Sequence, residues 1–369
     1  MKYYIIAGEA SGDLHGSNLI HHLNKLDSKA HFRAWGGDKM HAEGAEIVKH
    51  YRDLAFMGFI EVIVNLGTIL KNISFCKKDI LAYQPDVIIL IDYPGFNLRI
   101  AEFAHKNGIK VFYYISPQIW AWKENRVHKI KQVVDRMFVI LPFEKDFYAR
   151  FDMEVSFPGH PLLDAILSYK NQVKESNLFS DSQPIIALLP GSRKQEISTM
   201  LPVMLNSLRD LEKYKIIVAM APSIPKEFYT AIVGDKQVVL RDGVTYSILS
   251  EAKAALVTSG TATLEAALFK VPEIVCYKGN GISFWLAKQL IKVKYISLVN
   301  LILDKPALPE LIQDKMNAEN INIALKSILN PGESRNSMLN SFDELEEKLG
   351  GSGASERAAK EMFSRLSSI

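Results

Sequence analysis

The stretch Ser259-Gly260-Thr261-Ala262-Thr263-Leu264-Glu265 follows the apolar run 254–257 and has the pattern of a strand, a turn of small residues and a helix start. A helix start offers unpaired backbone N–H groups and the positive end of the helix dipole, which suit a phosphate. A second strand-to-loop transition, Leu188-Leu189-Pro190-Gly191-Ser192-Arg193, ends in an arginine. Together the two stretches predict a diphosphate pocket and hence a nucleotide-linked substrate.

Short apolar runs alternate with amphipathic stretches along the whole chain. Because the runs are continuously apolar, they indicate parallel strands that are covered on both faces. The expected strands are 3–7, 87–91, 111–115, 137–141, 185–189, 216–220, 238–240, 254–257 and 274–277. The pattern predicts an α/β protein built from two doubly wound domains.

The length of 369 residues exceeds the usual size of a single core and favours two domains. A polar segment, 168–183, is the expected seam. Gly-Gly-Ser-Gly at 350–353 precedes a last helix over about 356–366. We therefore expect domains at 1–168 and 169–349, followed by a C-terminal helical segment at 350–369.

Composition excludes several classes of protein. A chain that is 48% hydrophobic and 23% charged is expected to fold, and a net charge of only +3 gives no case for nucleic-acid binding. The two cysteines, Cys76 and Cys276, are too far apart in sequence to suggest a disulfide framework or a zinc site. The nearly apolar segment 54–70 is shorter than the about 20 residues that span a bilayer. The N-terminus runs directly into a strand pattern, without a signal peptide. A cytoplasmic protein that does not cross a membrane is expected.

The segment 8–16 follows the first strand, where a dinucleotide fingerprint would stand. Its glycines are spaced four apart rather than as G-x-G-x-x-G, which disfavours a nicotinamide cofactor. We expect a loop that carries Glu9, Ser11 and Asp13 towards a substrate. The alternative is a tight turn that only needs glycine conformations.

Asp92 follows the strand 87–91, and ligands of open parallel sheets bind beyond the carboxyl ends of strands. This placement suits a general base, although an aspartate there can equally be a helix cap or turn former. Trp120 and Trp122 follow the next strand and could stack on a sugar or pack between elements. His15 and His160 are the candidate histidine bases, with structural roles as the alternative.

The ordered motifs along nearly the whole chain resemble those of the lipid-A-disaccharide synthase family. The matching segments are 8–16, 35–40, 57–62, 92–97, 116–122, 142–144, 159–161, 189–193, 259–265, 284–288 and 297–301.

The resemblance implies the GT-B glycosyltransferase architecture, in which two Rossmann-like domains face a cleft and the C-terminal helix returns to the N-terminal domain. It implies inverting transfer of 2,3-diacylglucosamine from its UDP derivative to the 6-hydroxyl of 2,3-diacylglucosamine 1-phosphate. The products are the β-1,6 disaccharide 1-phosphate of lipid A biosynthesis and UDP. No metal or other cofactor is expected, and the sequence has no Asp-x-Asp pair.

The resemblance also supplies site residues. Asp92 is the expected base, with Glu9 and Asp13 as alternatives. The expected UDP and phosphate contacts are Ser192, Arg193, Ser259, Gly260, Thr261, Ala262, Thr263, Glu265 and Asn300. The expected acceptor side comprises Ser11, Gly12, Asn97, Trp120, Trp122 and His160. Gly95 stands where the family usually has a second aspartate, so the chemistry rests more heavily on Asp92. Val299 replaces a usual proline, which alters loop stiffness.

The acyl chains of both sugars place them in a membrane, so the enzyme must reach them at the membrane surface. Over 59–73 the apolar residues form helical stripes that are wider than a surface helix needs, and basic residues follow. We expect peripheral attachment to the anionic inner face of the cytoplasmic membrane through Phe59, Ile63, Leu66, Ile69 and Leu70. The alternative is a helix buried between elements or at a subunit contact, and a homodimer is compatible with the glycine hinge.

Three other functions compete with this interpretation. A UDP-N-acetylglucosamine enzyme, such as an epimerase, would share the fold and the phosphate site but would not need the apolar helix. An NAD-dependent oxidoreductase lacks its fingerprint here. A lipid-binding protein without activity would have no use for Arg193 together with the 259–265 turn.

Overall fold

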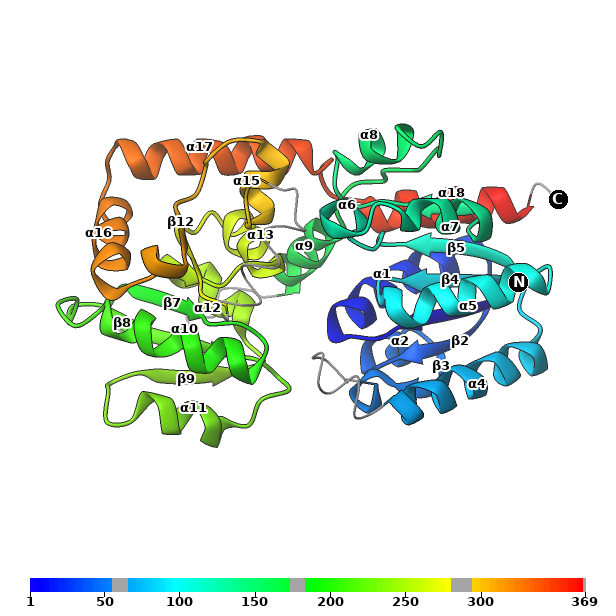
Figure 1. Ribbon diagram of the computed structural model, residues 1–369, viewed down its shortest axis with the longest axis horizontal. Coiled ribbons are helices and arrows are strands. Elements are labelled where there is room, and N and C mark those ends of the chain that lie inside the picture. The colour runs from blue at the N-terminus through cyan, green and yellow to red at the C-terminus, as the bar shows by residue number, and fades with distance from the viewer. Residues whose placement is uncertain (55–65, 173–182, 280–293, 368–369) are drawn as a thin grey trace. The chain divides into compact units, whose positions relative to one another are not determined.

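The computed structural model describes residues 1–54, 66–172, 183–279 and 294–367, and the chain forms two compact units. Unit 1 comprises Met1–Leu167 and Leu349–Ile369, and unit 2 comprises Ser168–Lys348. The described residues of each unit contain one six-stranded parallel sheet with helices against it (Figure 1).

Unit 1 alternates strands and helices, and its strand order is β3-β2-β1-β4-β5-β6. The strands are β1 (Lys2–Ala7), β2 (His31–Gly36), β3 (Glu46–His50), β4 (Val87–Ile91), β5 (Lys110–Tyr114) and β6 (Arg136–Phe138). The helices are α1 (Ala10–Leu26), α2 (Asp38–Ala42), η1 (Tyr51–Asp53), α4 (Leu66–Tyr83), α5 (Pro94–Lys106), α6 (Ile119–Trp122), α7 (Arg126–Val133), α8 (Glu144–Ala149), α9 (Leu162–Gln172) and α18 (Ala354–Ser367).

Unit 2 repeats this topology with the order β12-β11-β10-β7-β8-β9. Its strands are β7 (Ile185–Leu189), β8 (Lys215–Met220), β9 (Val239–Asp242), β10 (Ala252–Val257), β11 (Glu273–Tyr277) and β12 (Glu310–Ile312). Its helices are α10 (Lys194–Asn206), α11 (Lys226–Val233), α12 (Thr245–Glu251), α13 (Thr261–Leu268), α15 (Leu298–Leu303), η2 (Gln313–Lys315), α16 (Ala318–Leu329) and α17 (Glu333–Lys348). The division of the chain falls inside α9 and just after α17.

The fold class expected from the apolar runs is confirmed, because every expected strand is present in a parallel sheet. Strands β2, β3 and β12 were not predicted. β3 and β12 are edge strands with only partly buried or exposed residues, so they lack a continuous apolar run. β6 is shorter than expected, ending at Phe138.

The prediction of a loop over 8–16 was wrong, because α1 begins at Ala10. The glycines there serve close packing of the helix. A side chain at Gly12 would lie 2.9 Å from the Ala7 Cβ, and one at Gly16 would overlap Met40. Glycines four apart therefore line the helix face that approaches the sheet, which a search for turns does not detect.

The C-terminal helix belongs to the core of unit 1. Ala358, Ala359 and Met362 of α18 are fully buried in the same cluster as β1 and β4 residues such as Ile5 and Ile89. In Figure 1, α18, drawn in red, runs beside the blue and cyan elements of this unit. Asp164 of α9 accepts hydrogen bonds from the backbone N–H groups of Gly353 and Ser355, so it caps this helix.

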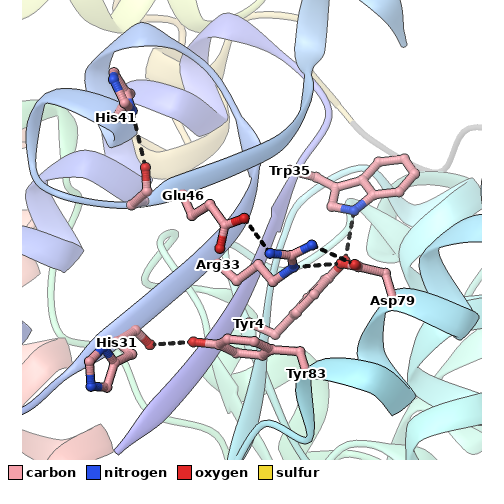
Figure 2. A network of polar contacts seen from close by, with 9 residues as sticks. Tyr4, His31, Arg33, Trp35, His41, Glu46, Asp79 and Tyr83 are labelled. Atoms are coloured by element: carbon pink, nitrogen blue, oxygen red, sulfur yellow. Dashed lines mark hydrogen bonds and ion pairs between the residues drawn. The ribbon is translucent and has the colours of Figure 1, made fainter.

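A polar network fastens α4 to the sheet of unit 1 (Figure 2). Arg33 of β2 forms two hydrogen bonds to Asp79 of α4, at 2.7 and 2.9 Å, and an ion pair with Glu46. Tyr4 donates to Asp79 at 2.7 Å and accepts from Trp35 at 2.8 Å. Burial alone would raise the pKa of Asp79, but the bonds from Arg33 and Tyr4 lower it below its ordinary value. The network fixes which face of α4 points outward.

No helix within the described parts of the chain is long and apolar enough to cross a membrane.

Glu273 opens β11 and is fully buried. Neither of its carboxyl oxygens has a hydrogen-bond partner among the described residues. Burial raises its pKa well above the ordinary value, so folding disfavours the charged form.

We predict that Glu273→Met raises the unfolding free energy of unit 2 at pH 7 by about 1–3 kcal/mol, because it removes a buried carboxyl group without a partner. Because the pKa of Glu273 is higher in the folded protein than in the unfolded one, Glu273 lowers the free energy of unfolding more as pH rises from the unfolded-state pKa to the folded-state pKa. The gain should therefore shrink at low pH. Urea unfolding at pH 7 and pH 4.5 measures both effects, and a variant less stable than wild type at pH 7 would contradict this account.

Candidate functional site

The candidate residues gather where the strand order of each sheet reverses. In unit 1 the reversal lies between β1 and β4, which pair with Ala7 opposite Ile91. Glu9 and Asp92 follow these two strand ends. In unit 2 it lies between β7 and β10, which pair with Leu189 opposite Val257. The segments ending at Arg193 and Gly260 follow these ends. Open α/β sheets bind ligands at such points.

The chain turns sharply after β4, and Asp92 sits at the turn. Asp92 and Tyr93 have φ values of 44° and 48°, and Ile115, after the neighbouring β5, has 67°. Such left-handed conformations cost energy for residues other than glycine, and they cluster at functional sites. Gly8 permits the turn, because a Cβ there would lie 2.5 Å from the Tyr93 ring.

Hydrogen bonds to the backbone hold Asp92 in this conformation. Its carbonyl oxygen accepts from Asn97 Nδ2 at 2.7 Å and from the Tyr113 hydroxyl at 2.6 Å. Its N–H is shared between the carbonyl oxygens of Tyr114 and Ile115, each at 3.3 Å. The side chain of Asp92 takes no part in these bonds, and the residue as a whole keeps some exposure to solvent.

Burial raises the pKa of Asp92 to about 7, and the negative charge of Glu9 adds to this rise, while a hydrogen bond from the Tyr93 backbone opposes it. A carboxylate with a pKa near the working pH is suited to general base catalysis. Glu9 is the partly exposed N-cap residue of α1 and does not cap it with its side chain.

Asp13 is occupied differently. Its carboxylate accepts backbone hydrogen bonds from Gly37 at 2.7 Å and from Lys39 and Met40 at 3.1 Å. It is 2% exposed, and it fixes the start of α2. These bonds use its lone pairs, so the structure favours Asp92 over Asp13 as a base.

The other expected acceptor-side residues have varied surroundings. Asn97 is buried and holds the Asp92 backbone, whereas Ser11 is exposed on the first turn of α1. Gly12 is buried against Ala7. Trp120 is buried, with its ring edge-to-face on Phe143 at 4.9 Å. The side chain of Trp122 lies outside the described residues.

The two histidine candidates are buried and neutral. Burial lowers the pKa of His15 to about 4 and that of His160 to about 3. His15 lies within α1 rather than in a loop, and the His160 ring accepts a hydrogen bond from the Leu162 N–H at 3.2 Å. Their low basicity makes both weaker candidates for a base than Asp92.

In unit 2, α13 begins directly after β10 with its N-terminus open. Gly260 is the N-cap residue, with φ of 124°, and no side chain among the described residues caps the helix. The Ser259 hydroxyl donates to Ile296, and that of Thr263 donates to the Gly260 carbonyl. The backbone N–H groups of Thr261 and Ala262 are at the first turn. Such an open helix start suits an anion, so the phosphate site expected from the sequence stays a prediction.

At the end of β7, Glu196 accepts hydrogen bonds from the backbone N–H groups of Ser192, at 3.1 Å, and Arg193, at 3.3 Å. These two N–H groups are therefore engaged within the protein. The Arg193 side chain is 58% exposed and its guanidinium lies 3.7 Å from Glu196. The exposed guanidinium, rather than the backbone, is the group that can meet an anion here.

Two further expected contacts differ in what they offer. Burial raises the pKa of Glu265 to about 7, and a hydrogen bond with Tyr246 of α12 opposes this. The Asn300 amide is buried, donating to Leu308 and Glu310 and accepting from the Leu308 N–H at 2.8 Å. Asn300 therefore holds the segment between α15 and β12, and Glu265 keeps a carboxylate near the helix start.

The residues expected to face a membrane are only partly described. Phe59 and Ile63 lie outside the described residues, as does the side chain of Leu66. Ile69 is partly buried, while Leu70 is 52% exposed on α4. Within the described ranges, no three His, Cys, Asp or Glu side chains group closely enough to hold a metal ion.

Sequence reasoning missed Tyr113, Tyr246, Glu144 and Glu310. Tyr113 lies in a strand and Tyr246 in a helix outside every motif, and only the folded chain brings them to Asp92 and Glu265. Glu144 lies in the matching segment 142–144, and nothing in the sequence around it indicates that its carboxyl group is buried in the fold.

Solved structures with the same fold act on nucleotide-linked sugars or transfer glycosyl groups. A UDP-GlcNAc 2-epimerase from Neisseria meningitidis, bound to UDP-GlcNAc, is 12% identical with a TM-score of 0.71, covering 99% of this chain and 100% of that one. The calicheamicin glycosyltransferase CalG4 is 14% identical with a TM-score of 0.61, covering 100% and 98%. The fold is thus that of the GT-B class of glycosyltransferases and epimerases.

Sequence comparison is more specific. The model of the family described as lipid-A-disaccharide synthetase matches residues 3–363. The lipid-A-disaccharide synthase of Syntrophus aciditrophicus is 41% identical over 364 residues, which are 96% of this chain and 95% of that protein. That of Geobacter metallireducens is 39% identical over 367 residues, 97% and 95% of the two chains. The chain belongs to the lipid-A-disaccharide synthetase family.

Proposed function

We propose that this glycosyltransferase moves 2,3-diacylglucosamine from its UDP derivative to the 6-hydroxyl of 2,3-diacylglucosamine 1-phosphate. The acceptor oxygen bonds to the anomeric carbon as the bond from that carbon to the UDP oxygen breaks, and the anomeric configuration inverts. UDP leaves with the bonding electron pair, and the hydroxyl proton goes to a base. Membership of the family and the Asp92 turn carry this proposal together.

Asp92 is the proposed base. Its side chain is free of the hydrogen bonds that fix its backbone, and its pKa of about 7 lets it accept a proton at neutral pH. Glu9 beside it maintains the raised pKa. Gly95, on the first turn of α5, is exposed and has open space where a side chain would stand, so no second carboxylate is present at that position.

The leaving diphosphate is assigned to unit 2. The open start of α13 provides N–H groups and the positive end of a helix dipole, and Arg193 provides an exposed positive charge after β7. We propose that these groups stabilise the charge that grows on UDP, without a metal or other cofactor. Glu265 is proposed to accept hydrogen bonds from the ribose hydroxyls.

Attachment to an anionic membrane surface is proposed for α4. Its outward face exposes Leu70 by 52%, Phe75 by 48% and Leu81 by 50%, with the exposed Lys71 and Lys78 between them. Apolar side chains with neighbouring lysines suit an interfacial helix. The Arg33–Asp79 network holds this face outward.

We predict that Asp92→Asn lowers acceptor-dependent UDP release by about 10²- to 10⁴-fold, the usual contribution of a general base. In the wild type the rate should rise with pH through about 7, because a base with a raised pKa is protonated and inactive below it. Asp38→Asn is the matched control, since Asp38 is exposed at the start of α2. Unchanged activity in Asp92→Asn would transfer the role to Glu9.

We predict that Arg193→Ala weakens UDP binding about 10- to 100-fold, because charge-assisted hydrogen bonds contribute roughly 1.5–3 kcal/mol. Lys194→Ala is the control, since Lys194 is the adjacent exposed cation and lies over the Phe228 ring. Isothermal titration calorimetry measures both affinities. Equal losses in the two variants would mean that general positive charge, rather than the Arg193 fork, binds the diphosphate.

We predict that Leu70→Glu combined with Phe75→Glu reduces co-sedimentation with anionic vesicles several-fold, because it places two carboxylates on the face that meets the lipid. Ile323→Glu is the control, since Ile323 is 61% exposed on α16 of unit 2. Vesicle binding that survives the α4 changes would reject this surface as the attachment site.

A further inference from the structure

Glu144 is a buried carboxyl group at the sheet edge that carries Asp92, and the proposed chemistry does not use it. It opens α8 and is fully buried. Its Oε2 atom accepts hydrogen bonds from the backbone N–H groups of Leu141 at 2.9 Å and Ile140 at 3.1 Å. Its Oε1 atom has no partner among the described residues.

The groups that face Glu144 are mainly hydrogen-bond donors. They are the two N–H groups that precede α8, the indole N–H of Trp120 in α6, and the Ser116 hydroxyl from the segment after β5. The Ser116 hydroxyl donates to the Pro117 carbonyl oxygen at 3.2 Å. The Trp120 Nε1 atom also has no hydrogen-bond partner within the described ranges. The Tyr148 hydroxyl, from α8, is the other titratable group close by. Burial disfavours the ionised form of Glu144, whereas the surrounding donors favour it. Burial has the larger effect and raises the pKa of Glu144 to about 7.

Buried hydroxyl groups link this cradle to Asp92. The oxygen atoms of Ser116 and Tyr148 are 2.8 Å apart. Tyr148 lies close enough to Tyr113 to add to the rise that burial and Asp92 produce in the pKa of Tyr113. Tyr113 in turn donates to the Asp92 carbonyl oxygen at 2.6 Å. Ile115 directly precedes Ser116. Its backbone is in a left-handed conformation, and its carbonyl oxygen accepts a hydrogen bond from the Asp92 N–H.

We propose that Glu144 is a positioning residue for the transfer reaction. Its carboxylate fixes the start of α8 through the N–H groups of Ile140 and Leu141. Tyr148 of α8 then bonds to Ser116, which follows the end of β5 beside the Asp92 backbone. Ionisation of Glu144 places a negative charge near the unpaired Nε1 atom of Trp120, whose ring packs on the adjacent Phe143. This inference rests on the proposed function for its catalytic consequence, while the contact with Trp120 can be tested without any substrate.

The test without substrate is a pH titration of tryptophan fluorescence. The wild type should show a transition near pH 7 as a charge appears beside the Trp120 indole. The transition should disappear in Glu144→Gln and in Trp120→Phe, and it should persist in Asp92→Asn. A wild type without the transition, or a Glu144→Gln variant that keeps it, would overturn the proposal.

The test with substrates is steady-state UDP release. Glu144→Gln should lower kcat about 10- to 100-fold, as expected when a catalytic group is slightly misplaced. UDP affinity should not change, because the UDP groups belong to unit 2. Asp146→Asn, an exposed carboxylate on the same helix, is the matched control and should match wild type in every measurement. Wild-type kcat in Glu144→Gln would overturn the proposal.

Circular dichroism would detect whether Glu144→Gln fails to fold. In that case a second variant tests the proposal. Tyr148→Phe keeps the shape of the side chain and removes only the hydroxyl link, so it should also lower kcat, and a wild-type kcat would contradict the proposal. Absence of UDP release from the wild type would reject the proposed function itself. The fluorescence titration would still decide whether Glu144 ionises beside Trp120.

Discussion

The sharp turn after β4 is the constraint on which the rest of the unit 1 site depends. Asp92 and Tyr93 both take left-handed conformations, and Asn97 and Tyr113 hold the Asp92 carbonyl oxygen from two elements. These bonds use backbone atoms of Asp92, so they do not engage its carboxylate. Gly8 lets the Tyr93 ring come close, and Glu9 then stands near enough to raise the pKa of Asp92.

The two units have the same strand order but place groups of opposite charge at the point where that order reverses. In unit 1 the reversal of the sheet places Asp92 where burial, with a smaller contribution from the charge of Glu9, raises its pKa to about 7, so its ionised form can accept a proton at neutral pH. In unit 2 the reversal brings together an open helix start and an arginine, which suit a diphosphate. Proton removal and charge stabilisation in the proposed transfer therefore come from separate sheets.

Much of this organisation could be predicted from the sequence, because continuous apolar runs identify buried parallel strands and residues after strands identify the ligand edge. The helical conformation of 10–16 could not be predicted in this way. Gly12 and Gly16 are needed there for close packing against Ala7 and Met40, not for a turn. The engagement of Asp13 with α2 and of Asn300 with Leu308 depends on contacts between distant segments. The same holds for Tyr113, which no local motif marks.

The most direct test of the central claim is the pKa of Asp92 itself. Carboxyl carbon NMR of the protein labelled at aspartate side chains would follow each resonance with pH, and Asp92→Asn would assign the one of interest. The account predicts an aspartate that titrates near pH 7 and is missing from the Asp92→Asn spectrum. If the resonance lost in Asp92→Asn titrated near 4, as an ordinary aspartate does, the claim that the turn prepares a base would be contradicted.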